Sequence, residues 1–182
     1  MEIGATKAVQ DRLKTTKIEE SKGASLVFCW DTHLTKIKGR NVLFIVNASN
    51  RYTIAMTDIE PRNWNYYAMY IIRVIHGMMQ EMGYSEEQIE QYFKMSGDTT
   101  ITKTHGRKSV GGINRMVMDA QYFGKKLEKE AKYQWELSEY LNRDICQPEG
   151  FDAYGYPNEL FKLDMERLGI ATKRKPAKVI DS

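Results

Sequence analysis

The chain of 182 residues is long enough for one domain, and its 42% share of hydrophobic residues is ample for a core, which excludes wholesale disorder. A formal net charge of +3 does not by itself indicate a nucleic-acid partner, and two distant cysteines, Cys29 and Cys146, argue against a disulfide framework. The first residues lack the apolar region of a secretion signal, and no apolar run approaches the roughly 20 residues that cross a bilayer. We therefore expect a soluble cytoplasmic protein with reduced thiols and no membrane contact.

The N-terminal third of the chain predicts a short helix followed by three strands. Residues 6–14 place Val9 and Leu13 on one helical face. Runs of apolar, aromatic and β-branched residues, separated by turn signals, follow at 26–37, 41–48 and 52–57. Three strands joined by tight turns indicate an antiparallel meander.

Two helices are predicted after the strands. Pro61 opens the first, whose apolar residues recur at three- and four-residue steps from Trp64 to Met82, and Gly83 is placed to end it. Ser85 and Gln88 form a capping-box pattern that starts the second helix, which runs to about Met95.

The remaining part of the chain is predicted to be mainly helical. A β-prone segment at 99–104 precedes a stretch of helical periodicity from Ile113 to Ile145, which fits one long helix or two helices joined near Tyr133. Pro157 opens a last helix. A small antiparallel sheet followed by several helices and a long helical C-terminal part defines an α+β fold. We divide the chain into a core domain, residues 1–147, and a C-terminal loop, short helix and basic tail, residues 148–182.

The segment from Gly106 to Gly111 has half of a phosphate-binding loop motif. Gly112 and Ile113 stand where that motif requires lysine and serine or threonine, so nucleotide hydrolysis is disfavoured. A weaker anion site remains open, in which Ser109 caps a helix beside the basic residues Lys103, Arg107 and Lys108. The alternative is a solvated loop whose glycines permit close packing.

The histidines do not show the spacing of a metal site, so we expect no metal and no cofactor. Asp31 and His33 alternate along a predicted strand and therefore share a face. A small enzyme that uses Asp31, His33 and His105 is one hypothesis, although no nucleophile is indicated. Cys29 lies in an apolar context, which does not activate a thiol.

Positive charge is concentrated in windows without acidic residues, one between Asp31 and Asp58 and another between Asp98 and Asp119. A third window is the tail, with Lys173, Arg174, Lys175 and Lys178. If these windows converge, they form a surface for phosphate groups or for an acidic protein, with aromatic residues Trp30, Tyr52 and Tyr122 available for stacking. The predicted contact residues are Arg40, Arg51, Lys103, His105, Arg107, Lys108 and Arg115.

Several of these residues also carry a family resemblance, which covers residues 5 to about 125. The chain resembles a bacterial domain family of unknown function that recurs in mobile-element and host genomes. The matching positions are Thr6, Lys7, Leu13, Trp30, Leu34, Arg40, Leu43, Phe44, Asn47, Thr102, Lys103, Arg107, Ser109, Val110, Gly112 and Asn114. The chain departs from the family pattern at Asp31 and His33, where histidine and asparagine are usual, and at Lys108, which appears as an insertion.

Within this group, the length, the basic windows and the helical C-terminal part are similar to type II-A anti-CRISPR proteins, which are Cas9 inhibitors carried by phage or plasmid DNA. The resemblance implies a non-enzymatic protein that binds the Cas9–guide RNA complex, with or without DNA, and blocks DNA cleavage. The alternative is a general DNA- or RNA-binding module of a mobile element. The oligomeric state is not indicated.

Overall fold

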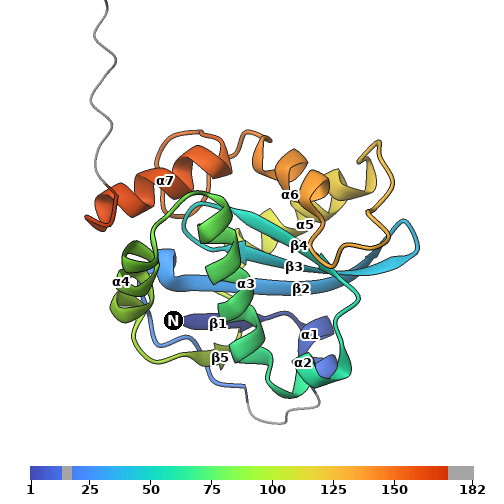
Figure 1. Ribbon diagram of the computed structural model, residues 1–182, viewed down its shortest axis with the longest axis horizontal. Coiled ribbons are helices and arrows are strands. Elements are labelled where there is room, and N and C mark those ends of the chain that lie inside the picture. Colours follow the sequence, from blue (N-terminus) through green and yellow to red (C-terminus); the bar gives the residue numbers. More distant parts are fainter. Residues whose placement is uncertain (14–17, 172–182) are drawn as a thin grey trace, which may run out of the picture.

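The computed structural model describes residues 1–13 and 18–171, and this part of the chain has an α+β fold (Figure 1). Five strands and seven α-helices are present in the described ranges, together with one short 3-10 helix, η1. The elements are β1 (Glu2–Ala5), α1 (Lys7–Leu13), η1 (Leu26–Phe28), β2 (Cys29–Ile37), β3 (Arg40–Asn47), β4 (Thr53–Thr57), α2 (Pro61–Asn65), α3 (Tyr67–Glu81), α4 (Glu86–Ser96), β5 (Thr100–Thr102), α5 (Arg107–Gln121), α6 (Trp135–Asn142) and α7 (Pro157–Arg167).

The strands form one mixed sheet in the order β4-β3-β2-β1-β5. Strands β2, β3 and β4 pair antiparallel, whereas β1 pairs parallel with both β2 and β5. The three predicted strands thus pair antiparallel in consecutive order, but the sheet as a whole is mixed, because a strand not foreseen in the sequence lies between β2 and β5. Strand β1 has only four residues and all of them are buried, so it shows no alternation of polar and apolar residues.

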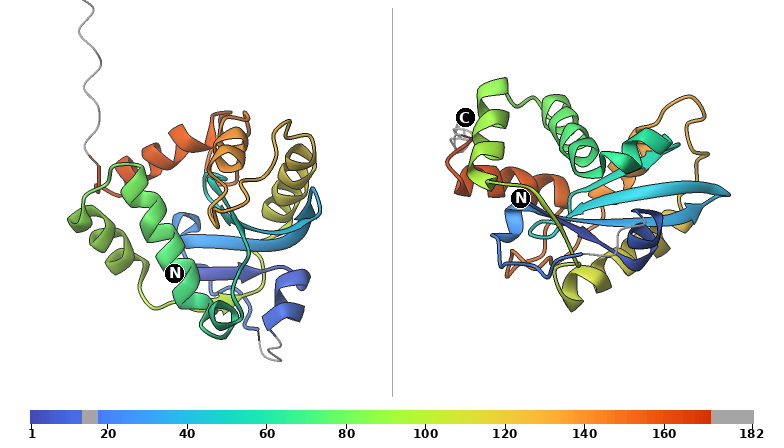
Figure 2. Two further views of the ribbon diagram at one scale, coloured as in Figure 1. Left: turned by 45° about the vertical axis from the view of Figure 1, so that its right-hand side comes forward. Right: turned by 90° about the horizontal axis from the view of Figure 1, so that it is seen from below.

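Helices cover both faces of the sheet, and Figure 2 shows α3 and α5 on opposite sides. On β3, Leu43 and Ile45 pack into a core with α3, α4 and α7. Val42, Phe44 and Val46 alternate with them and pack into a second core with α5 and α6. Burial on both faces explains why this strand reads as a continuous apolar run.

The helices differ from the prediction in two places. The expected helix from Trp64 to Met82 is divided into α2 and α3, with a break at Tyr66. A single long helix from Ile113 to Ile145 is also wrong. The alternative of two helices agrees with α5 and α6, but they are not joined near Tyr133, because α5 ends at Gln121 and α6 begins only at Trp135. The intervening sequence includes Gly124 and many charged residues, and its apolar residues Phe123 and Leu127 pack into the core from irregular backbone.

The predicted start of α4 is confirmed. Ser85 accepts a hydrogen bond from the Gln88 backbone N–H at 3.3 Å, and the Gln88 side chain accepts one from the Ser85 N–H at 2.9 Å. Gly83, which follows α3, has a φ of 84°, a value that favours glycine.

The outer edge of β4 is covered by residues 131–142. Asn142 accepts a hydrogen bond from the Thr53 N–H at 2.7 Å and donates one to the Thr53 carbonyl at 2.8 Å. Ser138, one helical turn earlier, accepts from the Ala55 N–H at 3.0 Å. Two α6 side chains, four residues apart, thus make the hydrogen bonds to the β4 backbone that a neighbouring strand would otherwise make.

The C-terminal helix α7 packs against the same core as α3. Its fully buried Phe161 lies 6.2 Å from Trp30 and 5.3 Å from Tyr52, measured between ring centroids. The division of the chain at residues 147 and 148 remains a prediction. The four basic residues predicted for the tail, Lys173, Arg174, Lys175 and Lys178, lie outside the described residues. Among the helices that the structure describes, none is both long and apolar enough to cross a bilayer.

Candidate functional site

The part of the α5 face that lies over β1 and β2 is polar. Glu2 pairs in register with Cys29, and Gly4 pairs with Asp31. Neighbouring residues of a parallel pair point to the same side, and positions two apart on a strand share a face. Glu2, Cys29 and Asp31 therefore lie together, and all three residues are buried.

His105 enters this polar region from the loop between β5 and α5. Its Nδ1 lies 2.7 Å from Asp31 Oδ1, and its Nε2 lies 3.0 Å from Glu2 Oε2. The side chains are 3% exposed for His105, 0% for Asp31 and 5% for Glu2. We call Glu2, Asp31 and His105 the histidine–carboxylate cluster.

The cluster is charged although it is buried. Burial favours a neutral ring, but the hydrogen bonds and charges around His105, first those of Asp31, outweigh burial and raise its pKa to about 10. Burial likewise works against ionised Glu2, yet hydrogen bonds from the Ser21 hydroxyl and the Lys22 N–H lower the pKa of this carboxyl. The arrangement is an imidazolium that donates from both nitrogens to two carboxylates.

The cluster also fixes the start of α5. Asp31 accepts hydrogen bonds from the Ser109 hydroxyl and, at 3.3 Å, from the His105 N–H. The predicted helix cap at Ser109 is wrong, because the N-cap is Gly106 and the hydroxyl of Ser109 is directed inward to Asp31. A carboxylate below the first turn of a helix also interacts favourably with the helix dipole.

A pocket of about 330 Å³ lies beside this first turn. Arg51, from the turn after β3, donates a hydrogen bond to the Gly112 carbonyl at 2.8 Å, and Lys108 donates to the Pro148 carbonyl at 3.3 Å. We call this the α5 pocket, and it is lined by Val46, Asn47, Ala48, Arg51, Lys108, Ser109, Gly111, Gly112, Gln147, Pro148 and Glu149. Two of the seven predicted contact residues thus converge from separate segments.

Arg107 and His105 lie next to this pocket in the chain but differ in exposure. Arg107 is exposed and has no ion pair with any residue in the described ranges 1–13 and 18–171. The side chain of His105 is enclosed in the cluster and does not present its charge at the surface. Of the two, only Arg107 is available for contact with a partner.

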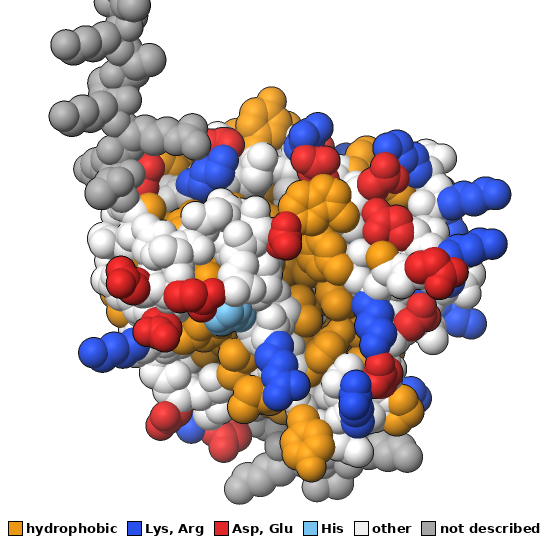
Figure 3. All heavy atoms as spheres, in the orientation of Figure 1, with side chains coloured by type: hydrophobic (Ala, Val, Ile, Leu, Met, Phe, Trp, Pro, Cys, Tyr) orange, Lys and Arg blue, Asp and Glu red, His pale blue; other side chains and the backbone are white. Residues whose placement is uncertain are grey.

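The other three predicted contact residues are paired with carboxylates. Arg40 lies 2.5 Å from Asp58, Lys103 pairs with Glu20, and Arg115 lies 3.1 Å from Asp119. Figure 3 shows acidic and basic side chains interspersed on the face seen in Figure 1. The predicted residues are therefore not gathered on one uniformly basic surface.

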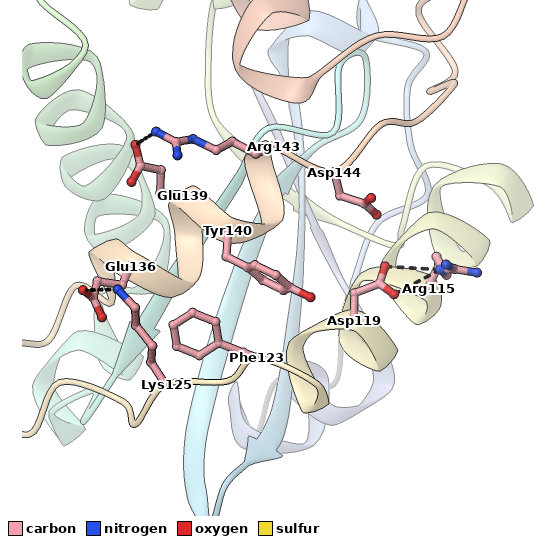
Figure 4. Close-up of a pocket in the computed structure, with 9 residues that line it drawn as sticks. All are labelled: Arg115, Asp119, Phe123, Lys125, Glu136, Glu139, Tyr140, Arg143 and Asp144. Carbon is pink, nitrogen blue, oxygen red and sulfur yellow. Dashed lines mark hydrogen bonds and ion pairs between the residues drawn. The ribbon is translucent and has the colours of Figure 1, made fainter.

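Arg115 lines a different pocket, of about 460 Å³, between α5 and α6 (Figure 4). Its wall contains three ion pairs around two aromatic rings: Arg115–Asp119, Lys125–Glu136 and Arg143–Glu139 around Phe123 and Tyr140. Basic and acidic groups alternate in this wall, so it does not favour an anion over a cation.

The three residues of the enzyme hypothesis are only partly brought together. Asp31 contacts His105, whereas His33 Nδ1 lies 3.1 Å from the Thr6 hydroxyl. Burial lowers the pKa of His33. Both nitrogens of His105 face carboxylates, so the ring as placed has no free nitrogen to accept a proton from a substrate.

The aromatic residues proposed for stacking differ in their exposure. Trp30 and Tyr52 belong to the core, while Tyr122 is 78% exposed. Trp30 and Tyr52 are therefore unable to stack on a nucleic-acid base.

Three side chains of different chemistry lie close enough to share a metal ion. A carboxylate oxygen of Glu2, the Sγ of Cys29 and a ring nitrogen of His105 are all within 4.8 Å of one another. The sequence spacing of histidines could not indicate this group, because its members come from β1, β2 and the loop before α5.

Two functional candidates, Glu2 and Gly4, were missed because β1 was not predicted. A Cβ atom at Gly4 would lie 1.8 Å from Asp31 Oδ1, so glycine is required where the carboxylate crosses the strand. In the sequence, the alternation of Cys29, Asp31 and His33 already indicated that one face of β2 is polar.

The fold and this geometry define a class: an α+β domain in which a buried, charged histidine cluster supports the first turn of a surface helix. The chain belongs to a family described as a domain of unknown function (DUF6933), whose model matches residues 2–160. No curated protein and no solved structure shows significant similarity to the chain.

Proposed function

We propose that the protein binds a partner that contains nucleic acid, and that the α5 pocket receives a phosphate group of that partner. The observation that carries this proposal is the convergence of Arg51 and Lys108 beside the first turn of α5. The exposed Arg107 adds a third positive charge at the same turn. Guanidinium and ammonium groups near helix N–H groups are suited to phosphate oxygens.

The histidine–carboxylate cluster holds the first turn of α5, which borders the pocket, in place. Ser109 and the backbone of His105 are fixed by Asp31, so the first turn of α5 does not need to be ordered by the ligand. Such preorganisation reduces the entropic cost of binding. Glu149 also lines the pocket and follows Pro148, whose carbonyl accepts from Lys108, and we therefore expect the phosphate on the side of Arg51.

The narrower proposal is that the partner is a Cas9–guide RNA complex, with inhibition by occlusion or conformational trapping and no turnover. Its support is the resemblance described above, and the phosphate-binding chemistry proposed for the α5 pocket is compatible with a guide RNA. The broader alternative is a general DNA- or RNA-binding module.

Charge reversal at Arg107 and Lys108 tests the proposal. We expect the double variant R107E/K108E to bind single-stranded and double-stranded nucleic acid more weakly, with a salt dependence whose log–log slope falls by about 1 for each lost phosphate contact. The matched control is R115E, on the same helix, because Arg115 is already paired with Asp119. Equal weakening by R115E, or full binding by the double variant, would remove the α5 pocket from the interface.

A cleavage assay with Cas9, guide RNA and target DNA separates the narrower proposal from the broader one. Inhibition by the wild type that is lost in R107E/K108E and kept in R115E supports a Cas9–guide RNA partner. Binding to free nucleic acid without inhibition supports the general module. Absence of both activities would refute the proposal.

A further inference from the structure

We infer that Glu2, Cys29 and His105 form a binding site for a transition-metal ion, with zinc as the best-suited metal. The site is distinct from the α5 pocket, and the inference does not depend on nucleic-acid binding. It rests on three donors from three separate segments, all within 4.8 Å of one another.

The donor set selects the class of metal. Thiolate, imidazole and carboxylate are the three side-chain types that hold zinc in proteins. A thiolate ligand disfavours magnesium and calcium, which take oxygen donors. Three protein ligands leave a fourth tetrahedral position, which a water molecule or a backbone carbonyl can occupy.

Asp31 is placed as the outer partner of a metal-binding histidine. It accepts a hydrogen bond from Nδ1 of His105 at 2.7 Å, which directs Nε2 toward Glu2 at 3.0 Å. Metal-ligating histidines commonly donate their other N–H to a carboxylate, which fixes the tautomer and the ring orientation. Gly4 provides the space for this carboxylate, so the outer partner depends on a residue with no side chain.

The neighbourhood of Cys29 is also favourable. Its sulfur lies 3.6 Å from the carbonyl oxygen of Ala24 and 3.5 Å from that of Ser25. These are weak contacts for a thiol, and a metal ion would replace them with a covalent-like bond. The segment that contains Ala24 and Ser25 also covers Glu2 through Ser21 and Lys22, so it closes the site from solvent.

Metal binding displaces protons from the donors that it engages. A divalent ion forms bonds to Glu2 oxygen, Cys29 sulfur and His105 Nε2, and the protons on that sulfur and that nitrogen leave to solvent. The thiolate and the carboxylate that bind the ion then balance its two positive charges.

Reconstitution with cobalt and zinc tests this site. The full chain is unfolded with a chelator and a reductant, refolded with a small excess of Co²⁺ or Zn²⁺, and freed of loosely bound metal by gel filtration. We expect one metal ion per chain by elemental analysis, and a thiolate-to-cobalt charge-transfer band in the near-ultraviolet spectrum of the cobalt form. Zinc binding should release about two protons per chain in a weakly buffered solution.

The two cysteines provide a matched pair of variants. C146S should keep the metal and the band, because Cys146 lies in a separate apolar cluster with Phe151 and Leu160. C29S should lose the band and bind zinc at least about tenfold more weakly. If C29S does not fold, a band that persists in C146S still shows that Cys29 binds the cobalt ion, since the chain has only two cysteines. Failure of wild type and C146S to retain metal, or a band that disappears in C146S, would overturn the site.

Discussion

At the scale of single residues, Gly4 shows most directly how the site constrains the sequence. Its backbone pairs with Asp31 in the parallel β1–β2 ladder, and the carboxylate of Asp31 occupies the space above it. The Asp31 carboxylate accepts a hydrogen bond from His105, whose other ring nitrogen contacts Glu2. Glu2 lies on β1, as Gly4 does. Strand β1 thus supplies the Glu2 carboxylate to the cluster, and at Gly4 it leaves room for the carboxylate of Asp31.

Replacement of Gly4 by alanine should therefore be destabilising. A Cβ atom would lie 1.8 Å from Asp31 Oδ1, and we expect G4A to lower the free energy of unfolding by about 1–3 kcal/mol or more. The control is G77A on α3, where an added Cβ meets nothing within 4 Å and where alanine gains up to about 1 kcal/mol of helix propensity. Urea denaturation measures both. A stability of G4A equal to that of the wild type would show that Asp31 is free to move.

The candidate site could be predicted only in part. Alternation along a strand correctly placed Asp31 and His33 on one face, and Asp31 does contact His105. Glu2 could not be predicted, because the register of a parallel pair depends on contacts between segments far apart in the chain. Ion pairing of Arg40 was likewise beyond a linear search for basic windows, since Asp58 comes close to it only when β3 and β4 pair. The Arg115–Asp119 pair is four residues apart on one helix and was visible in the sequence, but Asp119 was counted only as the end of the window.

At the scale of elements, α6 is best understood as the closure of the sheet edge. Its Asn142 and Ser138 bond to backbone groups of β4, and Gln134 N–H donates to the Ala55 carbonyl at 2.9 Å. Exposed edges of sheets invite pairing with other chains, and this helix removes that opportunity at β4.

Asn142 should accordingly contribute more to stability than a surface asparagine. N142A leaves the N–H and the carbonyl of buried Thr53 without these partners, and we expect a loss of about 2 kcal/mol or more. The control N114A, at an exposed position of α5, should change stability by less than about 0.5 kcal/mol. Thermal or urea unfolding gives the comparison. Similar small losses in both variants would mean that water replaces the side chain of Asn142.

Short-range patterns predicted elements with strong local signals. The apolar stripe of α3, the capping box of α4 and the runs that became β2, β3 and β4 were all visible in the sequence. The sequence allowed two helices joined near Tyr133, but the length of the break between α5 and α6 was missed, because apolar residues continue across it at nearly helical steps. Those residues, such as Phe123 and Leu127, instead pack from irregular backbone into the core beneath α5.

At the scale of the whole molecule, α7 ties the C-terminal part of the described chain to the main core. Phe161 contacts aromatic rings from β2, from the residue before β4 and from the turn after α3. The segment that follows residue 147 therefore shares its interior with the sheet.

Removal of the Phe161 ring should destabilise the whole fold. We expect F161A to cost about 3–5 kcal/mol and to move the unfolding transitions seen by far-ultraviolet circular dichroism and by tryptophan fluorescence together. L163A is the control, since Leu163 is 44% exposed on the same helix and its loss should cost about 0.5 kcal/mol. If the two probes separate in F161A, residues 148–171 form an independently melting unit.

The position of β1 has a consequence for the order of events during synthesis. Glu2 and His105 are 103 residues apart in the sequence, yet they meet in the same buried cluster. As the chain emerges from the ribosome, β2, β3 and β4 can pair while β1 still lacks its second neighbour. The ionised glutamate then remains in water until the residues around β5 arrive, and docking of that late segment completes the sheet and seals its charges from solvent.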